Sequence, residues 1–446
     1  GVNKQGIHPR GSSNIMRTRR LSALTAGVGA LSLVAAACGD VDDDGAAETE
    51  APAETAAEEE EAPAETDAAA EDEEMADEDE MSEDEEMADE EGEMSEMAEC
   101  ESIDSVSLQL QWFIQAQFAG YFAAQDQGFY EDFCLEVEIV EGGVEIVPQT
   151  QLENGDVDFA LAWVPKALQS REAGANITNI AQTFQRSGTL QVSFADSGIT
   201  TPADFEGKKI GNWGFGNEYE VFAAIGQAGL DLGDVNHVGQ QFDMVALLDG
   251  EIDAAEAMTY NEYAQVLEAE NPDTGELYQP EDFSVISYEE VGVGMLQDAI
   301  WADAEKLESD EAYRDIAERF VAASIEGWAY CRDNVEACRD IVVAEGSTLG
   351  ASHQLWQMNE VNKLIWPSTN GVGYIDQTAW DRTVEISQNT PNLDGATVLT
   401  EAPSEGAFTN DVVEAAWALL ESHGLDLDLS GESFAPIEVE LQPGGE

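Results

Sequence analysis

The chain has 446 residues and carries 94 Asp and Glu against 17 Lys and Arg, a formal net charge of −77. This balance argues against a nucleic-acid-binding protein, because phosphate contacts need clustered Lys and Arg, and against charge-driven docking on anionic membranes. Residues 100–446 hold 63 acids and 12 bases, and they are numerous enough for two lobes of ordinary domain size.

The amino-terminal residues have the layout of an export signal. Met16 opens a basic run, an apolar run of small residues covers 21–37, and Cys38 follows directly. This order is typical of a secretory signal peptide, and a Cys after small residues resembles the lipobox of bacterial lipoproteins. We therefore expect residues 1–38 to be a signal peptide whose true start is Met16, with a lipid such as palmitate on Cys38. The alternative is a transmembrane anchor, for which the run is short.

The next segment is too acidic to fold by itself. Residues 41–99 hold 30 acids and no base, in repeats of Glu, Asp, Ala and Met. Such a composition cannot bury a core, and its charges repel one another. We expect 39–99 to be an acidic disordered linker that holds the folded part away from the cell surface. Calcium binding is the alternative, but no loop pattern supports it.

Four cysteines follow Cys38, an even number that suggests two disulfides in an exported chain. Cys100 and Cys134 each precede a strand-like run, and their pairing requires those strands to be parallel neighbours. Cys331 and Cys338 would lie too far apart on one unbroken helix. A corner at 333–334 would bring them together, whereas a zinc site is disfavoured because CxxC spacing is absent.

Strand-like and helical segments alternate along the first part of the folded region. This rhythm predicts a parallel sheet that binds ligands outside the carboxyl ends of its strands. The expected elements are a strand over 106–110, a helix over 119–133, a strand over 135–143, a helix over 147–154, a strand over 157–162, a helix over 164–173 and a strand over 176–184.

The pattern then restarts and gives way to a helical end. Two α/β units and a returning tail predict a hinged two-lobe fold that closes over a ligand. We expect the first lobe over 100–196, the second over 197–295 and a return to the first over 296–446. The elements are strands over 189–195 and 208–213, a helix from about Glu218, and helices over 311–330, 335–345, 352–365 and 378–388.

No catalytic pattern accompanies this architecture. The sequence has no G-x-S-x-G, H-E-x-x-H, Walker or kinase pattern, and its four histidines neighbour no nucleophile in a known motif. We therefore expect a binding protein and no enzyme, with no cofactor and no metal.

The candidate ligand-binding residues are aromatic, amide and carboxyl side chains near strand ends. Flat rings flanked by amides suit a planar heterocycle that forms hydrogen bonds. An anion would instead need Arg, for which Arg186 is the main candidate. Core packing is the alternative for these aromatics and is favoured for Phe118, Tyr121 and Phe122. The candidates are Trp112, Gln115, Gln117, Trp163, Trp213, Asn217, Glu218, Tyr219, Asp243, Tyr260, Asn261 and Glu262.

Several stretches resemble solute-binding proteins of ABC importers, in the branch related to thiamine-pyrimidine synthases. They are LQLQWFIQAQFAGYFAAQDQGFY, FEGKKIGNWGFGNEYEVFAAIGQAGL, FDMVALLDGEIDAAEAMTYNEYAQVLE and QLWQMNEVNKLIWPS, and the resemblance covers nearly all of 103–420. It implies an α/β fold of the two-lobe periplasmic-binding-protein type 2 class, with a hinge and a C-terminal helical return.

Within that branch the chain is most similar to riboflavin-binding members. Pyrimidine binders tend to begin LDW-x-PN-TNHTG, whereas this chain has LQWFIQAQFAG, and they lack the GNEYE run at 216–220. The resemblance implies a lipid-anchored receptor on the extracytoplasmic face of the cell membrane that passes riboflavin to an ABC permease and its ATPase subunits. The alternative is a receptor for formylaminopyrimidine, hydroxymethylpyrimidine or another small solute.

Overall fold

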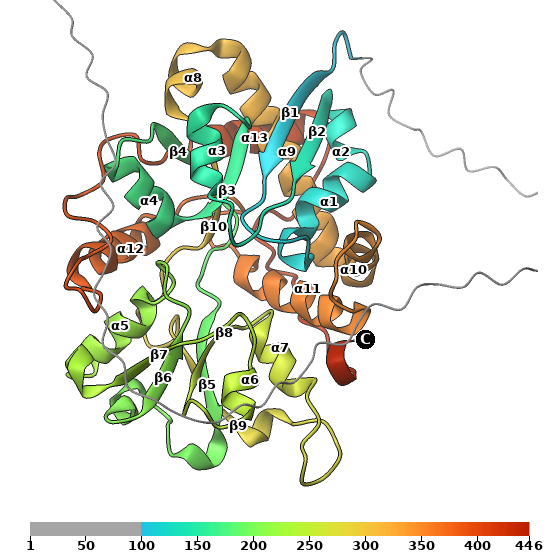
Figure 1. Ribbon diagram of the computed structural model, residues 1–446. Helices are drawn as coiled ribbons and strands as arrows, with labels where there is room; N and C mark the ends of the chain where they lie inside the picture. Colours follow the sequence, from blue (N-terminus) through green and yellow to red (C-terminus); the bar gives the residue numbers. More distant parts are fainter. Residues whose placement is uncertain (1–99, 446) are drawn as a thin grey trace, which may run out of the picture. The chain divides into compact units, whose positions relative to one another are not determined.

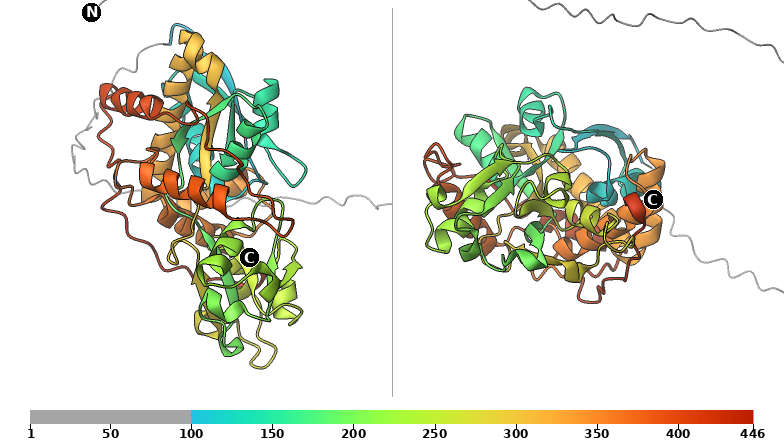
Figure 2. Two further views of the ribbon diagram at one scale, coloured as in Figure 1. Left: turned by 90° about the vertical axis from the view of Figure 1, so that its left-hand side faces the viewer. Right: turned by 60° about the horizontal axis from the view of Figure 1, so that its bottom comes forward.

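The computed structural model describes residues 100–445. The expected signal peptide, the lipid on Cys38 and the acidic linker lie outside the described residues. The described part forms two α/β lobes on separate sheets: cyan to teal-green and orange to red segments make the first, and light green to yellow segments make the second (Figures 1 and 2). Within residues 100–445, no helix combines the length and apolarity that crossing a membrane would require.

The first lobe is built on a five-stranded mixed sheet. β1 runs parallel to β2 and β3, whereas β10 lies antiparallel between β3 and β4. The parallel βαβ pattern is confirmed for the first three strands, but β10 was not predicted, because its short buried run stands alone after the second lobe. In spatial order the strands are β2 (Leu135–Val140), β1 (Asp104–Gln109), β3 (Phe159–Trp163), β10 (Asp298–Asp303) and β4 (Ile177–Gln182).

Helices cover both faces of this sheet. Phe159 and Leu161 pack into a core with α1 and α9, while Ala160 and Ala162 on the other face pack with α4, as the alternation of a strand requires. Phe118, Tyr121 and Phe122 are buried in the first core, which confirms their packing role. The helices are α1 (Ala119–Asp126), α2 (Phe129–Asp132), α3 (Pro148–Asn154), α4 (Val164–Glu172), α8 (Ala304–Ser309), α9 (Glu311–Asp333), α10 (Val335–Ala344), α11 (Ala351–Ile365), α12 (Gln377–Asn389) and α13 (Asp411–Ser422).

The second lobe contains a three-stranded antiparallel sheet and a parallel pair of strands. β5 lies between β8 and β9, and a bridge from Ile210 to Ala254 joins the pair β6–β7 to β8. The elements are β5 (Thr189–Phe194), β6 (Lys209–Asn212), α5 (Tyr219–Gln227), β7 (Asn236–Gly239), α6 (Val245–Leu248), β8 (Ala255–Met258), α7 (Glu262–Leu267) and β9 (Phe283–Ser287).

Two chain segments, 183–188 and 288–297, connect the lobes and are bonded to each other. The Gln297 side chain accepts from the Gly188 N–H at 2.9 Å and donates to Thr189 Oγ1 at 2.8 Å. The Tyr288 N–H donates to the Thr189 carbonyl at 3.1 Å. Paired connecting segments of this kind act as a hinge, because small backbone rotations in them reorient whole lobes.

Two disulfides lie in the first lobe. Asp104 of β1 is opposite Leu135 of β2, and the bond between Cys100 and Cys134 spans Cα atoms 5.7 Å apart. α9 ends at Asp333 and α10 begins at Val335, so the chain turns between them, and Cys331 and Cys338 are joined across a Cα distance of 5.4 Å.

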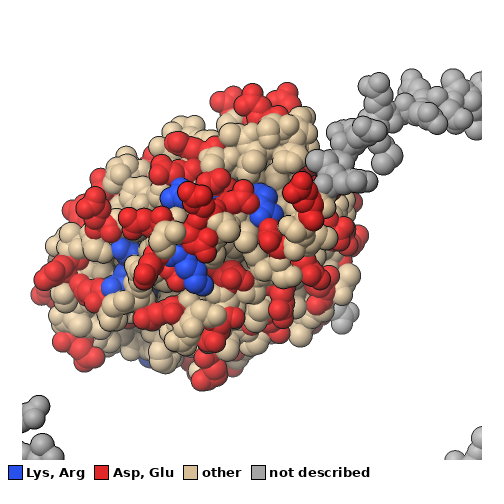
Figure 3. Space-filling view, turned by 90° about the horizontal axis from the view of Figure 1, so that it is seen from above, with Lys and Arg blue, Asp and Glu red and all other residues tan. Residues whose placement is uncertain are grey.

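Acidic side chains cover much of the face of the first lobe seen from above, with only isolated Lys and Arg between them (Figure 3). This distribution agrees with the large acid excess of the sequence. The face seen there offers no continuous basic surface for a polyanion.

Candidate functional site

A cavity of about 590 Å³ lies between the two lobes. It is lined by the loop after β1, by α3 and the start of α4, and by the loops after β6, β7 and β8. The carboxyl ends of β1 and β3 face it, as expected for an α/β sheet. Nine of the twelve candidate residues line it: Trp112, Gln115, Gln117, Trp163, Trp213, Asn217, Tyr260, Asn261 and Glu262.

Aromatic rings form a chain across this cavity. Trp112 of the first lobe meets Phe242 of the second lobe edge to face, with ring centroids 4.9 Å apart. Phe242 in turn stacks on Trp213 at 6.0 Å with an interplanar angle of 25°. Both lobes therefore contribute ring faces or edges to one space, which is the arrangement that a flat ligand needs. Phe242 was not predicted from the sequence.

The buried carboxylate of Asp298 organises the first-lobe wall. It accepts from Gln111 Nε2 at 2.6 Å, from Trp163 Nε1 at 2.8 Å and from Gln117 Nε2 at 2.9 Å. Burial raises the pKa of Asp298 to about 6, although these three donors favour the charged form. The carboxylate therefore fixes the orientation of the Trp163 ring. Asp298 was not predicted as a site residue, because the sequence does not predict the strand that begins with it.

The glutamines of this wall are bonded to protein groups. Gln115 Nε2 donates to Gln117 Oε1 at 2.6 Å. The backbone N–H of Ala116 donates to Gln354 Oε1 at 2.6 Å, and that of Gln117 to Gln357 Oε1 at 3.3 Å. A row of amides therefore runs from α11 to Asp298, and it stiffens the wall.

Three candidates do not line the cavity. Glu218 Oε2 accepts from the Gly216 N–H at 2.8 Å and so holds the turn before α5. Tyr219 is 5% exposed and packs in the core against α5 neighbours. Asp243 Oδ1 accepts from the Val245 N–H at 3.0 Å at the start of α6. From its place after a strand we predicted a ligand-facing role for each of these three side chains; in the structure a local backbone N–H group or the core holds each of them.

The turn before α7 ties the second lobe to α11. Asn261 Nδ2 donates to Glu262 Oε1 at 2.8 Å, while Asn261 Oδ1 lies 2.9 Å from His353 Nε2. The other ring nitrogen of His353 lies 3.0 Å from the carboxylate of Glu268. Tyr260 is 2% exposed. This corner of the cavity is therefore held by side chains from both lobes.

One lysine, Lys166 of α4, is the only Lys or Arg among the residues that line this cavity. Its Nζ lies 5.0 Å from the centroid of the Trp163 ring. Burial lowers the pKa of Lys166 to about 8, and the nearby carboxylates of Glu256, Glu218 and Asp298 oppose this effect. Lys166 was not predicted as a site residue from the sequence.

Arg186, the main candidate cation if the ligand were an anion, does not line the cavity. Its Nη1 donates to the carbonyls of Lys363 and Trp366, and its Nη2 donates to the carbonyl of Pro367 at 2.6 Å. The guanidinium therefore fastens the end of α11, where the chain presents several unpaired carbonyls.

The cavity mouth carries an apolar rim that was also not predicted. Val144, Val147 and Phe215 are exposed to 58, 50 and 94% and all line the cavity. Phe215 has φ +53° between Gly214 at +69° and Gly216 at +88°, a left-handed conformation that is costly for a residue with a side chain. The turn thus holds a large ring out at the edge of the cleft.

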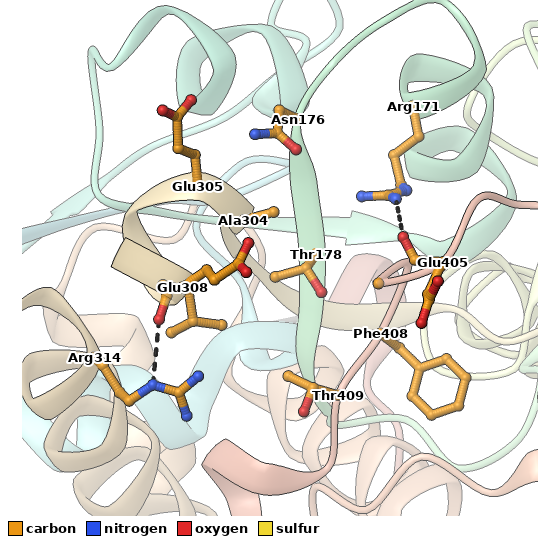
Figure 4. Close-up of a pocket in the computed structure, with 12 residues that line it drawn as sticks. Arg171, Asn176, Thr178, Ala304, Glu305, Glu308, Arg314, Glu405, Phe408 and Thr409 are labelled. Atoms are coloured by element: carbon orange, nitrogen blue, oxygen red, sulfur yellow. Dashed lines mark hydrogen bonds between the residues drawn. The ribbon is translucent and has the colours of Figure 1, made fainter. Parts of the chain in front are cut away.

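A second cavity of about 370 Å³ lies on the first lobe beside α8 and β4 (Figure 4). Its arginines are occupied: Arg171 donates to the carbonyls of Ile177 and Glu405, and Arg314 to that of Leu307. None of the twelve candidates lines it. Within residues 100–445, no group of three or more His, Cys, Asp and Glu side chains is arranged to hold a metal ion. The cleft between the lobes is therefore the candidate ligand site.

Two hinged α/β lobes around such a cleft define the periplasmic-binding-protein type 2 fold. The chain is similar to the solved periplasmic sulfonate-binding protein SsuA of a sulfonate ABC transporter from Methylobacillus flagellatus. The TM-score is 0.51 at 15% identity, over 77% of this chain and 100% of the other. A protein from Bordetella bronchiseptica gives a TM-score of 0.52 at 16% identity, over 72% and 98% of the two chains.

The sequence pattern of the family described as NMT1/THI5 like matches residues 115–337, half of the chain. The chain belongs to this family. It is also 23% identical over 340 residues to the riboflavin-binding protein RibY of Chloroflexus aurantiacus, covering 70% of this chain and 87% of that protein.

Two further relatives have names that refer to a pyrimidine ligand or to thiamine biosynthesis. The formylaminopyrimidine-binding protein of Halalkalibacterium halodurans is 22% identical over 249 residues, which cover 54% of this chain and 71% of that protein. A Haemophilus influenzae protein named for thiamine biosynthesis is 27% identical over 190 residues, 42% of this chain, and the match spans only 60% of that protein.

Proposed function

We propose that this protein is the substrate-binding lipoprotein of an ABC importer and that it binds riboflavin for delivery to a membrane permease. The observation that carries the proposal is the cavity between the lobes, to which Trp112 and Trp163 come from one side and Trp213 and Phe242 from the other. A flat ring system held there would contact both lobes at once. The match to RibY over 87% of that protein supports the same ligand.

The size and polarity of the cavity suit an uncharged fused-ring ligand. About 590 Å³ is within the usual range for pockets that enclose a small molecule. The carboxylates of Glu262 and Asp298 lie at or behind its walls, and the whole chain is strongly acidic. These charges disfavour phosphorylated ligands by repulsion, so we favour riboflavin over its phosphate ester.

Capture would proceed by lobe closure. A ligand that touches both lobes gains contacts only when they approach, so it shifts the population toward the closed state. The two connecting segments at 183–188 and 288–297 are the proposed hinge. The permease would recognise the closed form on the extracytoplasmic side of the membrane, where Cys38 would hold the protein by a lipid anchor. The ligand would be released chemically unchanged.

The second candidate ligand is a thiamine-pyrimidine precursor. It is favoured by the relative named for formylaminopyrimidine binding, which the chain matches over 71% of that protein's length. A single small ring would leave more of the cavity to water than a fused tricyclic ring would. This difference in filling makes riboflavin the first choice.

Titration of the protein with riboflavin and with formylaminopyrimidine, followed by tryptophan fluorescence, tests the proposal. Because the cavity contains three indoles, we expect strong quenching by riboflavin at micromolar concentration and a weaker response to the pyrimidine. No quenching by riboflavin would contradict the riboflavin assignment. Recovery of a converted product by mass spectrometry after incubation would instead indicate an enzyme.

A further inference from the structure

Most polar donors at the cavity wall already have protein partners. Gln111 Nε2, Gln117 Nε2 and Trp163 Nε1 all donate to Asp298. Asn217 Nδ2 donates to the carbonyl of Gly214 at 2.9 Å. These side chains therefore shape the wall, and forming a bond to a ligand would require them to break an existing one.

Lys166 differs from all of them. In the described part of the chain its ammonium makes no hydrogen bond and no ion pair within 4.0 Å, whereas Lys208 donates a hydrogen bond to the Ser197 carbonyl and Lys363 pairs with Glu360. The nearest charged groups that act on it are Glu256 and Glu218 of the second lobe and Asp298 of the first. It is thus a half-buried cation at the cleft wall without an acceptor of its own.

The position of this ammonium is well defined. It lies 5.0 Å from the centre of the Trp163 ring, to which a cation is attracted, and that ring is fixed through its bond to Asp298. On the other lobe, a side-chain carbon at Gly216 would be only 3.8 Å from Cε of Lys166. Lys166 therefore spans the space between the lobes beside the aromatic wall.

A half-buried ammonium without an acceptor is unfavourable, because it has lost part of its hydration without gaining a replacement hydrogen bond. A ligand oxygen that enters the cleft would supply that bond. Gln149, also at the cavity wall and 5% exposed, has a side-chain amide with no hydrogen-bond partner among residues 100–445. A three-donor ammonium and an amide with both a donor and an acceptor are complementary to a ring edge that alternates C=O and N–H.

We infer that Lys166 determines ligand specificity by donating a hydrogen bond to a carbonyl oxygen on the edge of a planar heterocycle in the cleft, with Gln149 reading the adjoining N–H or C=O. The inference deepens the proposed function and rests on it for the class of ligand. It assigns recognition of the ring edge to two side chains that the sequence pattern did not indicate, and it leaves the glutamines bonded to Asp298 as positioning residues.

The test compares Lys166→Met with Lys306→Met in the full-length protein. Lys306 is a matched control, because its Nζ also lies over an aromatic ring, 5.5 Å from the centre of Tyr313, but it is outside the cavity. Riboflavin and formylaminopyrimidine are each titrated against the wild type and both variants. We expect Lys166→Met to weaken the binding of the preferred ligand at least twentyfold, Lys166→Arg to recover part of that loss, and Lys306→Met to change it less than twofold.

A second readout separates a contact from a packing role. If the ammonium donates to the ligand, wild-type affinity should fall between pH 7 and pH 9.5 as Lys166 loses its proton, and Lys166→Met should abolish this fall.

Equal affinity of the wild type and Lys166→Met for a ligand that binds would overturn the inference and leave the proposed function intact. Binding of formylaminopyrimidine alone, weakened by Lys166→Met, would overturn the riboflavin assignment and support the inference. Failure of both ligands to bind the wild type would overturn both.

Discussion

Replacing Asp298 with Asn should separate ligand binding from stability. An amide offers one oxygen, which can accept from Gln111 and Trp163, but its NH₂ would then face the Gln117 Nε2 donor. Gln117 cannot turn its amide over without losing the 2.6 Å bond that its Oε1 accepts from Gln115. A lost bond to a charged acceptor is worth about 1.5–3 kcal/mol. That bond orders the wall and does not touch the ligand. We therefore expect a loss of binding free energy at the lower end of this range, which corresponds to about a tenfold weaker riboflavin affinity.

The stability of Asp298→Asn should change in the opposite sense. The pKa of Asp298 is raised from 3.8 to about 6 even with its three donors, so at pH 8 the charged form costs the folded state about 3 kcal/mol. Removing the charge removes this cost, and we expect an unfolding free energy at pH 8 equal to or above that of the wild type.

Riboflavin titration and urea unfolding at pH 8 measure the two effects. Asp303→Asn, at the other end of β10 where the carboxylate caps α8, serves as the control and should bind normally. Unchanged affinity for riboflavin in Asp298→Asn would refute the role of this carboxylate as the support of the aromatic wall.

Three more predictions concern the cleft, pH and the disulfides. Trp112→Ala should weaken riboflavin binding at least tenfold with little change in the melting temperature, since the ring is only partly buried; an unchanged affinity would remove it from the site. Burial raises the pKa of Glu220 to about 7 and of Asp298 to about 6. As the pH falls, these two carboxyls therefore bind protons in the folded state at a higher pH than in the unfolded chain. These two carboxyls together should therefore lower the free energy of unfolding by about 3 kcal/mol between pH 5.5 and pH 8, and urea unfolding that shows a rise would contradict this. By loop length, Cys134→Ser should cost about 4 kcal/mol and Cys338→Ser about 2 kcal/mol; the reverse order in urea unfolding would argue against the entropic account.

The sequence predicted most local elements but not how distant strands meet. Strands and helices with clear periodicity, such as 135–140 and 311–333, are confirmed to within a few residues. Trp112 and Trp163 were located because a parallel strand ends before or at each of them. β10 was missed because its partners β3 and β4 lie more than a hundred residues earlier, and Asp298 was missed with it.

The roles of the remaining residues could not be predicted because they depend on local geometry. Lys166 lies in a helix where its neighbours suggest only an ordinary surface lysine, and its isolation depends on the second lobe closing over it. Glu218 and Asp243 looked like ligand groups, but a turn or helix start can use such a carboxylate itself. Whether such a carboxylate contacts a ligand or accepts from a local backbone N–H group depends on the backbone geometry, and a residue pattern does not contain that information.

The central place of β10 has a consequence for how the molecule is made. The strand that divides the first sheet leaves the ribosome only after the entire second lobe, so the second lobe is an insertion nested within the first. Until residues 298–303 arrive, β4 has no neighbour in its sheet and the indole of Trp163 has no carboxylate to hold it. A chain cut short after the second lobe would therefore contain all of that lobe and only an unfinished half of the first. The cleft between the lobes is consequently completed late, when the returning strand joins the first sheet.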